Sequence, residues 1–277
     1  MFRLLGSDNG FIHACGHRGH SIGAPENTLA ALTATRAYGG SSAEIDVMLT
    51  ADGEIVLMHD DFLDRTTNGS GLVSRATLAE IKALDGGSWF GAGFAGETVP
   101  TLAEAFAHAR EIGLGLVVEV KEFQATDRLV DRLGALIEET GAADDAIFIS
   151  FDHAFLKTLK DALPGIRTEG ILHARHADVV AVALAADLDS VSVEHMMFTA
   201  DDGEALHEEG IAVRLHLQRP DVYARYQATG LDLLADVRGF AAAGLIDTLS
   251  GDDVAFLSGL LAAATEGARA EDLAQSA

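Results

Sequence analysis

Short apolar stretches with the character of β-strands recur along the chain, separated by segments with helical spacing. The strand-like stretches are 11–17, 42–49, 114–120, 146–151, 167–172, 188–194, 212–217 and 231–237. The clearest helical segments are 28–39, 101–113, 126–141, 153–165 and 201–210. Alternating strands and helices, with several strands almost continuously apolar, predict parallel strands buried on both faces. Eight such units favour an α/β fold of the closed (β/α)8 TIM-barrel type, although the alternation alone also fits an open, doubly wound sheet.

One region interrupts this alternation. Segment 60–100 holds a helical piece (74–84) and a glycine-rich piece (86–97), and it looks like a small insertion in a strand-to-helix loop after the second strand unit. Barrels build their active sites on that side. We therefore expect the insertion to cap the site, with Trp89 or Phe90 in contact with the substrate; the alternative is that Trp89 forms the insertion's own core. The remainder of 1–277 is expected to be a single domain with a frayed tail at 265–277.

The charge balance excludes several classes of function. The chain has 19 Lys and Arg against 43 Asp and Glu, a formal net charge of −24. Nucleic acids and anionic membranes are bound through clustered basic residues, so neither is an expected partner. An anionic substrate must then be bound at a local positive site. One cysteine and the lack of a secretory signal or an apolar run of ~18 residues predict a soluble, cytoplasmic protein without membrane insertion.

Acidic residues lie on two neighbouring predicted strands. Glu44 and Asp46 are two positions apart, so both side chains face the same side of the strand. Glu119 stands near the end of the next barrel strand. A single Glu-x-Asp pair is usually solvated surface, but three carboxylates inside a barrel would repel one another strongly. A divalent cation relieves that repulsion, and oxygen ligands suit Mg²⁺ or Ca²⁺.

Histidines and cationic residues end strands beside these acids. His17 and His59 could exchange protons near neutral pH, as a general acid/base pair does. Arg18 and Lys121 add the positive charge that a phosphate requires. Each residue alone has a structural explanation, such as a core histidine at His17 or a loop pair at His59. Together they predict metal-assisted phosphoryl transfer.

Longer motifs point to a family. The stretches are GHRGHSIGAPENTLAAL (16–32), AEIDVMLTADGEIVLMHDDFLDRTTNGSG (43–71), GGSWFGAGFAGETVPTLAEAF (86–106) and VVEVK (117–121). In order and spacing they resemble the glycerophosphodiester phosphodiesterase family in its bacterial form, strongly over about 12–121 and more weakly beyond. The resemblance implies a TIM barrel. It also implies the following roles: metal ligands Glu44, Asp46 and Glu119; acid/base pair His17 and His59; phosphate-binding Arg18 and Lys121.

The resemblance further implies a reaction. A glycerophosphodiester is cleaved to glycerol 3-phosphate and an alcohol: the glycerol 2-hydroxyl attacks phosphorus, and water then opens a cyclic phosphate. The two histidines exchange acid and base roles between the steps, and the sequence does not say which acts first as base. Two alternatives remain, a phospholipase D-like lyase that forms a cyclic phosphate and a non-catalytic phosphate-binding barrel. The expected partner is a small phosphodiester, and the sequence leaves its alcohol and the oligomeric state open.

The later strands depart from the family pattern. The seventh barrel strand reads RLHLQRPD (214–221), where the family usually has a Trp-Thr-Val-Asn stretch. The eighth is interpreted as LLADVRG (233–239), which keeps an acid, Asp236, without the usual Thr or Pro. Glu194, His195 and His216 are candidates for the altered wall. These departures leave the metal and histidine residues intact and concern the alcohol half of the substrate.

Overall fold

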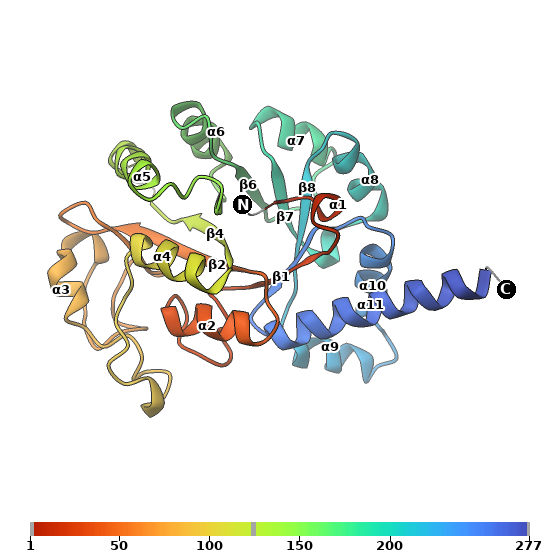
Figure 1. The fold of residues 1–277 in the computed structure, drawn as a ribbon, viewed down its shortest axis with the longest axis horizontal. Helices are drawn as coiled ribbons and strands as arrows, with labels where there is room; N and C mark the ends of the chain where they lie inside the picture. Colours follow the sequence, from red (N-terminus) through yellow and green to blue (C-terminus); the bar gives the residue numbers. More distant parts are fainter. Residues whose placement is uncertain (1–2, 123–125, 276–277) are drawn as a thin grey trace.

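The computed structural model describes residues 3–122 and 126–275 of the chain (Figure 1). The elements in chain order are α1 (Gly6–Asn9), β1 (His13–Gly16), α2 (Leu29–Ala37), β2 (Ser42–Leu49), β3 (Ile55–Leu57), η1 (Val73–Arg75), α3 (Leu78–Lys82), η2 (Ala92–Phe94), α4 (Leu102–Ile112), β4 (Gly115–Val120), α5 (Thr126–Thr140), β5 (Ala146–Ser150), α6 (His153–Ala162), β6 (Thr168–Leu172), α7 (Val179–Ala185), β7 (Ser190–Glu194), η3 (His195–Met197), α8 (Ala200–Glu208), β8 (Ala212–His216), α9 (Pro220–Gln227), α10 (Leu234–Ala242), β9 (Thr248–Gly251) and α11 (Val254–Gln275).

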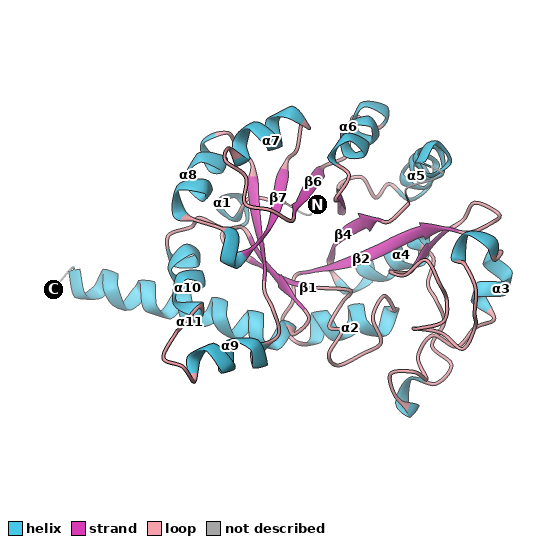
Figure 2. Ribbon diagram, turned by 180° about the vertical axis from the view of Figure 1, so that it is seen from behind, coloured by secondary structure: helices cyan, strands magenta, loops and turns pink. Residues whose placement is uncertain are grey.

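The strands form a closed barrel. They are hydrogen-bonded in the order β1-β9-β8-β7-β6-β5-β4-β2, and a further β1–β2 pairing closes the ring. All of these neighbours run parallel, while β3 pairs antiparallel with the far end of β2. Helices surround the strands, as Figures 1 and 2 show from opposite sides. The predicted (β/α)8 TIM barrel is confirmed.

Strand β2 shows why the sequence folds in this way. Ala43, Ile45 and Val47 alternate outward and pack in the core between the barrel and the helices. The residues between them, Glu44 and Asp46, face the barrel interior, where they are almost fully buried. Period-two alternation therefore gives one strand an apolar face for the helices and an acidic face for the interior.

The prediction for the eighth barrel strand is wrong. Most of 231–237 belongs to the start of α10, and Asp236 lies in the first turn of that helix. Its apolar residues recur at helical spacing, and Leu233, Leu234 and Val237 pack into the core around the later helices. The actual strand is β9, Thr-Leu-Ser-Gly, which has one strongly apolar residue and so gives almost no hydrophobic signal.

The predicted insertion, 60–100, follows β3 and contains η1, α3 and η2. It shares a small core with β2, β3 and the residue after β3: Met48, Val56, Met58, Leu63, Val73, Ile81 and Val99. A capping box, in which Thr77 and Glu80 bond each other's backbone, begins α3. The segment projects from one side of the barrel (Figure 1).

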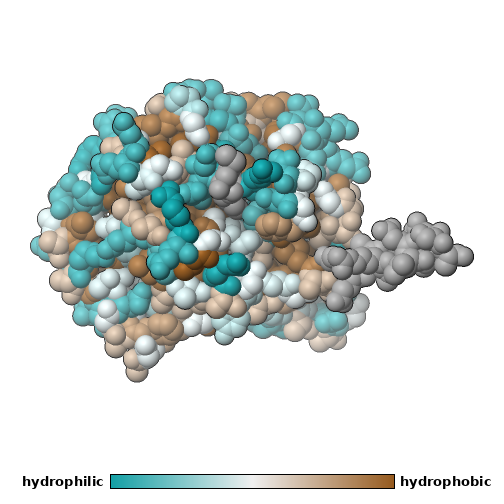
Figure 3. Space-filling view, in the orientation of Figure 1, coloured by the Kyte–Doolittle hydropathy of each residue, from teal (hydrophilic) through white to brown (hydrophobic). Residues whose placement is uncertain are grey.

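The outer surface mixes hydrophilic and hydrophobic residues on the face that Figure 3 shows. Among the described residues, no helix has the length and apolar character needed to cross a membrane. Helix α11 extends past the barrel toward the C-terminus and reaches Gln275 (Figure 1). The single-domain organisation and the frayed tail at 265–277 stay predictions, and residues 276–277 lie outside the described residues.

Candidate active site

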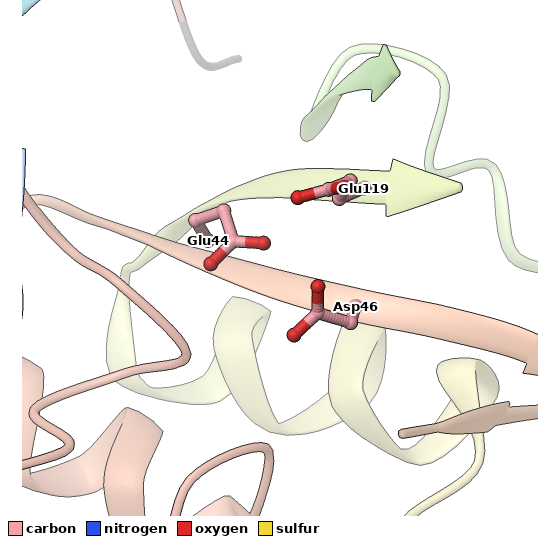
Figure 4. Close-up of side chains that lie close together, drawn as sticks. All are labelled: Glu44, Asp46 and Glu119. Atoms are coloured by element: carbon pink, nitrogen blue, oxygen red, sulfur yellow. The ribbon is translucent and has the colours of Figure 1, made fainter. Parts of the chain in front are cut away.

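Three buried carboxylates meet inside the barrel. Glu44 and Asp46 lie on β2 and Glu119 on β4, and Asp46 is paired in register with Glu119. Their exposed fractions are 1%, 0% and 6%. One oxygen from each lies within 4.8 Å of the others, and the side chains converge above the two strands (Figure 4). The structure therefore brings together the three residues that the sequence assigned to a metal.

This cluster has the properties of a divalent-cation site. Glu44 Oε1 is buried and accepts no hydrogen bond, and the buried Asp46 Oδ1 and Glu119 Oε1 lie near no donor other than the Lys121 ammonium in the described part of the chain. Burial, followed by the charge of Asp46, raises the pKa of Glu44 to about 7. The protein alone thus supplies one lysine for three buried carboxylates and opposes full ionisation of the group. Oxygen ligands of this kind fit a hard divalent cation.

The Lys121 ammonium lies against the same carboxylates. Its Nζ is 2.6 Å from Glu119 Oε1 and 3.3 Å from Asp46 Oδ1. Burial would lower the pKa of Lys121, but Asp46 and Glu119 outweigh it and raise the pKa. Lys121 therefore stays charged beside the cluster, where it offsets part of the negative charge.

Asp46 is fixed by residues that follow β1. Asn27 Nδ2 donates to Asp46 Oδ2 at 2.8 Å, and the Asp46 backbone N–H donates back to Asn27 Oδ1 at 2.9 Å. The Arg18 guanidinium lies 3.4 Å from Asp46 Oδ2, and the Arg18 backbone N–H donates to Glu44 Oε2 at 2.8 Å. Arg18 and Asn27 both have φ of 57°, a conformation that costs energy outside glycine and often occurs at functional sites. The reciprocal Asn27–Asp46 pair holds one carboxylate in a single orientation.

Two glycines allow this loop to pack tightly. A Cβ on Gly19, which has φ of +82°, would lie 2.6 Å from the Ala31 Cβ on α2. A Cβ on Gly16 would lie 2.6 Å from the Gly19 carbonyl oxygen. The close backbone approach at Gly16 and Gly19 lets the loop deliver His17 and Arg18 to the acidic cluster.

His17 follows β1 and is oriented by an acid from the other end of the chain. Its Nδ1 lies 2.7 Å from Asp252 Oδ1, and its Nε2 lies 4.0 Å from Glu44 Oε2. A carboxylate only accepts hydrogen bonds, so the Nδ1 hydrogen points to Asp252 and Nε2 faces the carboxylates. Burial alone would lower the pKa of His17, but the Asp252 hydrogen bond and the Glu44 charge outweigh it and raise the pKa.

His59 has a matching arrangement. Its Nδ1 lies 2.6 Å from Asp60 Oδ1, so its Nε2 is also left free. Asp60 accepts from Arg65 Nε at 2.6 Å, and Arg65 also binds Glu26. Glu26 in turn accepts from Arg18 at 2.8 Å. This chain of ion pairs connects the His59 loop, through Glu26, to the residues around Asp46.

A cavity of about 170 Å³ opens beside the acidic cluster. Its lining includes His17, Glu44 and Glu119. The strands β5 to β8 and the residues that follow them contribute Phe151, His173, Glu194, Arg214 and His216. Larger hollows of about 540 and 660 Å³ border the start of β1 and α11 and contain none of the cluster residues. Chemistry, rather than size, therefore identifies the site.

The structure separates the remaining candidates. Glu194 and His216 line the cavity, as expected for the altered wall. His195 is instead buried behind it, with its Nδ1 3.1 Å from the Tyr223 hydroxyl. Trp89 lies outside the lining: its indole N–H donates to the Gly86 carbonyl and its ring contacts Phe90. Its 39% exposure also keeps it out of the insertion's core.

Sequence reasoning missed two groups of residues. Asp252 directly follows β9, and it was hidden because that strand was not recognised. Arg214 and Glu169 form a buried ion pair across the barrel interior at 2.6 Å, with Ser190 donating to Glu169. Arg214 and Glu169 each stand on a strand, and the period-two alternation could have placed both inward once the strands were known. Asn27, which holds Asp46 by two hydrogen bonds, was not predicted as a site residue either.

The fold and the site define the class of (β/α)8 barrels with a carboxylate cluster fit for a divalent cation. The glycerophosphoryl diester phosphodiesterase family model matches residues 17–235. A glycerophosphodiester phosphodiesterase of Caldanaerobacter subterraneus is 39% identical over 158 residues, which cover 57% of this chain and 65% of that protein. The putative glycerophosphodiester phosphodiesterase YhdW of Bacillus subtilis is 38% identical over 157 residues, 57% of this chain and 64% of that protein. The matches thus span slightly less than two thirds of these two relatives.

Solved structures agree with this result. A phosphodiesterase of Oleispira antarctica, in complex with the product sn-glycerol-3-phosphate, superposes with a TM-score of 0.79. It is 27% identical, and the superposition covers 92% of this chain and 98% of the other. Because the family model covers most of its length, this chain belongs to the glycerophosphoryl diester phosphodiesterase family.

Proposed function

We propose that this protein is a metal-dependent phosphodiester hydrolase that cleaves glycerophosphodiesters to glycerol 3-phosphate and an alcohol. The observation that carries the proposal is the convergence of Glu44, Asp46 and Glu119 beside His17 in a barrel of this family. The product named for the Oleispira antarctica phosphodiesterase, sn-glycerol-3-phosphate, supports the choice of substrate class. The barrel and the cavity are consistent with a small-molecule substrate.

Glu44, Asp46 and Glu119 would hold the divalent cation, either Mg²⁺ or Ca²⁺. When bound, such an ion supplies Lewis-acid stabilisation of the negative charge that develops on the phosphoryl oxygens. Asn27 fixes Asp46 by its two hydrogen bonds, so the geometry of that ligand is set before the ion arrives.

His17 and His59 are proposed to move the protons. Each imidazole donates a hydrogen bond from Nδ1–H to an aspartate, Asp252 for His17 and Asp60 for His59. Its Nε2 is then available to the substrate. A neutral Nε2 accepts the proton of the attacking hydroxyl, and a protonated Nε2 on the other histidine donates a proton to the leaving alkoxide. Two such histidines allow one to act as base while the other acts as acid, and the roles then reverse for the water that opens a cyclic phosphate.

Arg18 and Lys121 are proposed to neutralise the phosphate. Both are held among carboxylates, with Arg18 bound to Glu26 and Lys121 bound to Glu119. These pairs keep the two cations charged and limit their movement, which is the preorganisation that electrostatic stabilisation needs. In a chain with net charge −24, they supply the local positive charge that an anionic substrate requires.

Product analysis tests this proposal. Purified protein is incubated with a panel of glycerophosphodiesters and Mg²⁺, Ca²⁺ or Mn²⁺, and glycerol 3-phosphate is measured by phosphate release through an added phosphatase. We expect glycerol 3-phosphate and the free alcohol to form in equal amounts. A cyclic phosphate as the final product would instead identify a lyase, and the lack of any product with every ion would favour a binding barrel. A cytoplasmic location and a substrate contact by Trp89 stay predictions.

A further inference from the structure

The part of the cavity lined by the ends of β5 to β8 has its own chemistry. In the barrel order, β5 to β8 lie between β4 and β9, and their ends contribute Phe151, His173, Glu194 and His216. Glu194 ends β7, and its side chain is partly buried. It accepts one hydrogen bond, from Gln218 Nε2 at 3.3 Å. A neutral amide leaves the charge of this carboxylate uncompensated.

Positive side chains near the cavity are already paired with other acids. The pairs are Lys121 with Asp46 and Glu119, Arg214 with Glu169, and Arg219 with Asp252. Within residues 3–122 and 126–275, Glu194 forms no ion pair. The neighbouring His216 does not supply a charge either, because burial and the nearby His17 lower its pKa to about 3. Glu194 is thus a single carboxylate without a counter-ion in a cavity built for an anionic phosphate.

Aromatic rings line the same part of the cavity. Phe151 is 39% exposed and stacks on His173, with ring centroids 4.2 Å apart and planes 12° apart. The Phe151 ring also has the Lys121 ammonium 5.8 Å from its centroid, so this ring already accepts one cation. Phe151, His173 and Glu194 line the same cavity, and proteins use aromatic rings together with carboxylates to bind quaternary and primary ammonium groups.

We propose that Glu194 and the Phe151–His173 pair select diesters whose alcohol carries a positive charge, an ammonium alcohol. The inference rests on the proposed hydrolysis and names the part of its substrate that the sequence left open. The phosphate would lie at the acidic cluster and the ammonium group at Glu194 and the Phe151–His173 pair in the same cavity. A polyol alcohol could also hydrogen-bond to Glu194, but it would not use the uncompensated charge.

The test compares two diesters of opposite character. Values of kcat/KM are measured with a saturating divalent cation for glycerophosphocholine, whose alcohol is cationic, and for glycerophosphoglycerol, whose alcohol is a neutral polyol. The wild-type protein is expected to prefer glycerophosphocholine. The ratio of interest is kcat/KM for glycerophosphocholine divided by kcat/KM for glycerophosphoglycerol. In Glu194→Gln this ratio should fall about tenfold, and in Glu194→Lys it should fall further, because charge repulsion replaces attraction.

Glu208→Gln is the matched control. Glu208 ends α8, the helix that follows β7, and it is exposed without an ion pair in the described part of the chain. Its substitution removes the same charge from the molecule and should leave the ratio unchanged. Competitive inhibition by free choline, weakened in Glu194→Gln but not in the control, would support the same assignment. Circular dichroism melts confirm that each variant is folded.

The outcomes separate this inference from the proposed function. If the wild-type protein cleaves both diesters and neither substitution at Glu194 changes the ratio, the inference is overturned and the hydrolase proposal stands. A wild-type preference for glycerophosphoglycerol that disappears in Glu194→Gln would overturn it in favour of a polyol site. If no diester is cleaved with any divalent cation, the proposed function fails and the inference fails with it.

Discussion

At the scale of single residues, two histidines share one arrangement. In His17 and His59, Nδ1 binds an aspartate, and the aspartate does not contact Nε2. The two aspartates come from different places, Asp60 from the adjacent position and Asp252 from the far end of the chain. The same local chemistry has thus been built twice, which suits two groups that must exchange proton-transfer roles.

Removing either histidine should remove its proton transfer. We expect His17→Ala and His59→Ala each to lower kcat by about 10²–10⁴-fold. The double variant should lose far less than the product of the two single effects, because both residues serve one proton relay. Calorimetry should show that both single variants still bind a divalent cation, since the cluster offers only oxygen ligands.

His108→Ala is the control for these variants, because His108 lies on α4 and contacts Thr33 outside the site. A variant at position 17 or 59 with near-normal turnover would show that its histidine is neither acid nor base. Loss of the metal from such a variant would instead make that histidine a ligand.

Asp252 should set both the orientation and the pKa of His17. Its hydrogen bond helps to raise the pKa of His17, so Asp252→Asn should lower that pKa. The limb of the pH–rate profile that reports His17 should then move to lower pH. An asparagine amide can also donate to Nδ1 and favour the wrong tautomer, so kcat should fall about 10²-fold or more.

Asp253→Asn is the matched control for Asp252. Asp253 caps α11 by accepting from the Phe256 backbone N–H, a role that asparagine can also fill. Both the pH profile and kcat should stay normal in this control. An unshifted profile with normal kcat in Asp252→Asn would show that Asp252 does not act through His17.

At the scale of elements, the sequence predicted strands well where hydrophobicity marks them. β2 and β4 are largely apolar, with Glu44 and Asp46 two positions apart on β2 and Glu119 on β4, so both the strands and the carboxylate cluster could be predicted. β9 consists of Thr-Leu-Ser-Gly and packs polar side chains inward, so hydrophobicity gave no signal for it. Asp252 was missed for the same reason, and an apolar helix start at 231–237 was taken for the strand.

The insertion provides a prediction at this scale. It directly follows His59 and carries Asp60 and Arg65, which hold that histidine, so it borders the site, and its Trp89 residue is 39% exposed. If Trp89 contacts the bound substrate, Trp89→Ala should raise KM several-fold with kcat unchanged, as expected when only uniform binding is lost. Phe62→Ala, another exposed aromatic of the insertion, is the control. An unchanged KM would leave Trp89 as a packing residue of its own loop.

At the scale of the whole molecule, the barrel gathers positive side chains in a strongly acidic chain. The chain carries a net charge of −24, yet its site must accept an anionic phosphodiester. Closing the sheet brings Arg18, Lys121 and Arg214 to one interior, where each pairs with an acid. This closure joins residues from both ends of the chain, and long-range pairs such as Arg214 with Glu169 could not be predicted without the complete strand order.

The central claim is that the carboxylate cluster holds the divalent cation needed for phosphodiester hydrolysis. The most direct measurement is glycerophosphodiester turnover together with calorimetric metal binding, for EDTA-treated wild-type protein and for Glu44→Gln. We predict that the treated protein is inactive, that one equivalent of Mg²⁺ or Ca²⁺ restores activity, and that Glu44→Gln binds the ion more weakly. Full turnover by the metal-free wild-type protein, or unchanged metal affinity in Glu44→Gln, would contradict the account.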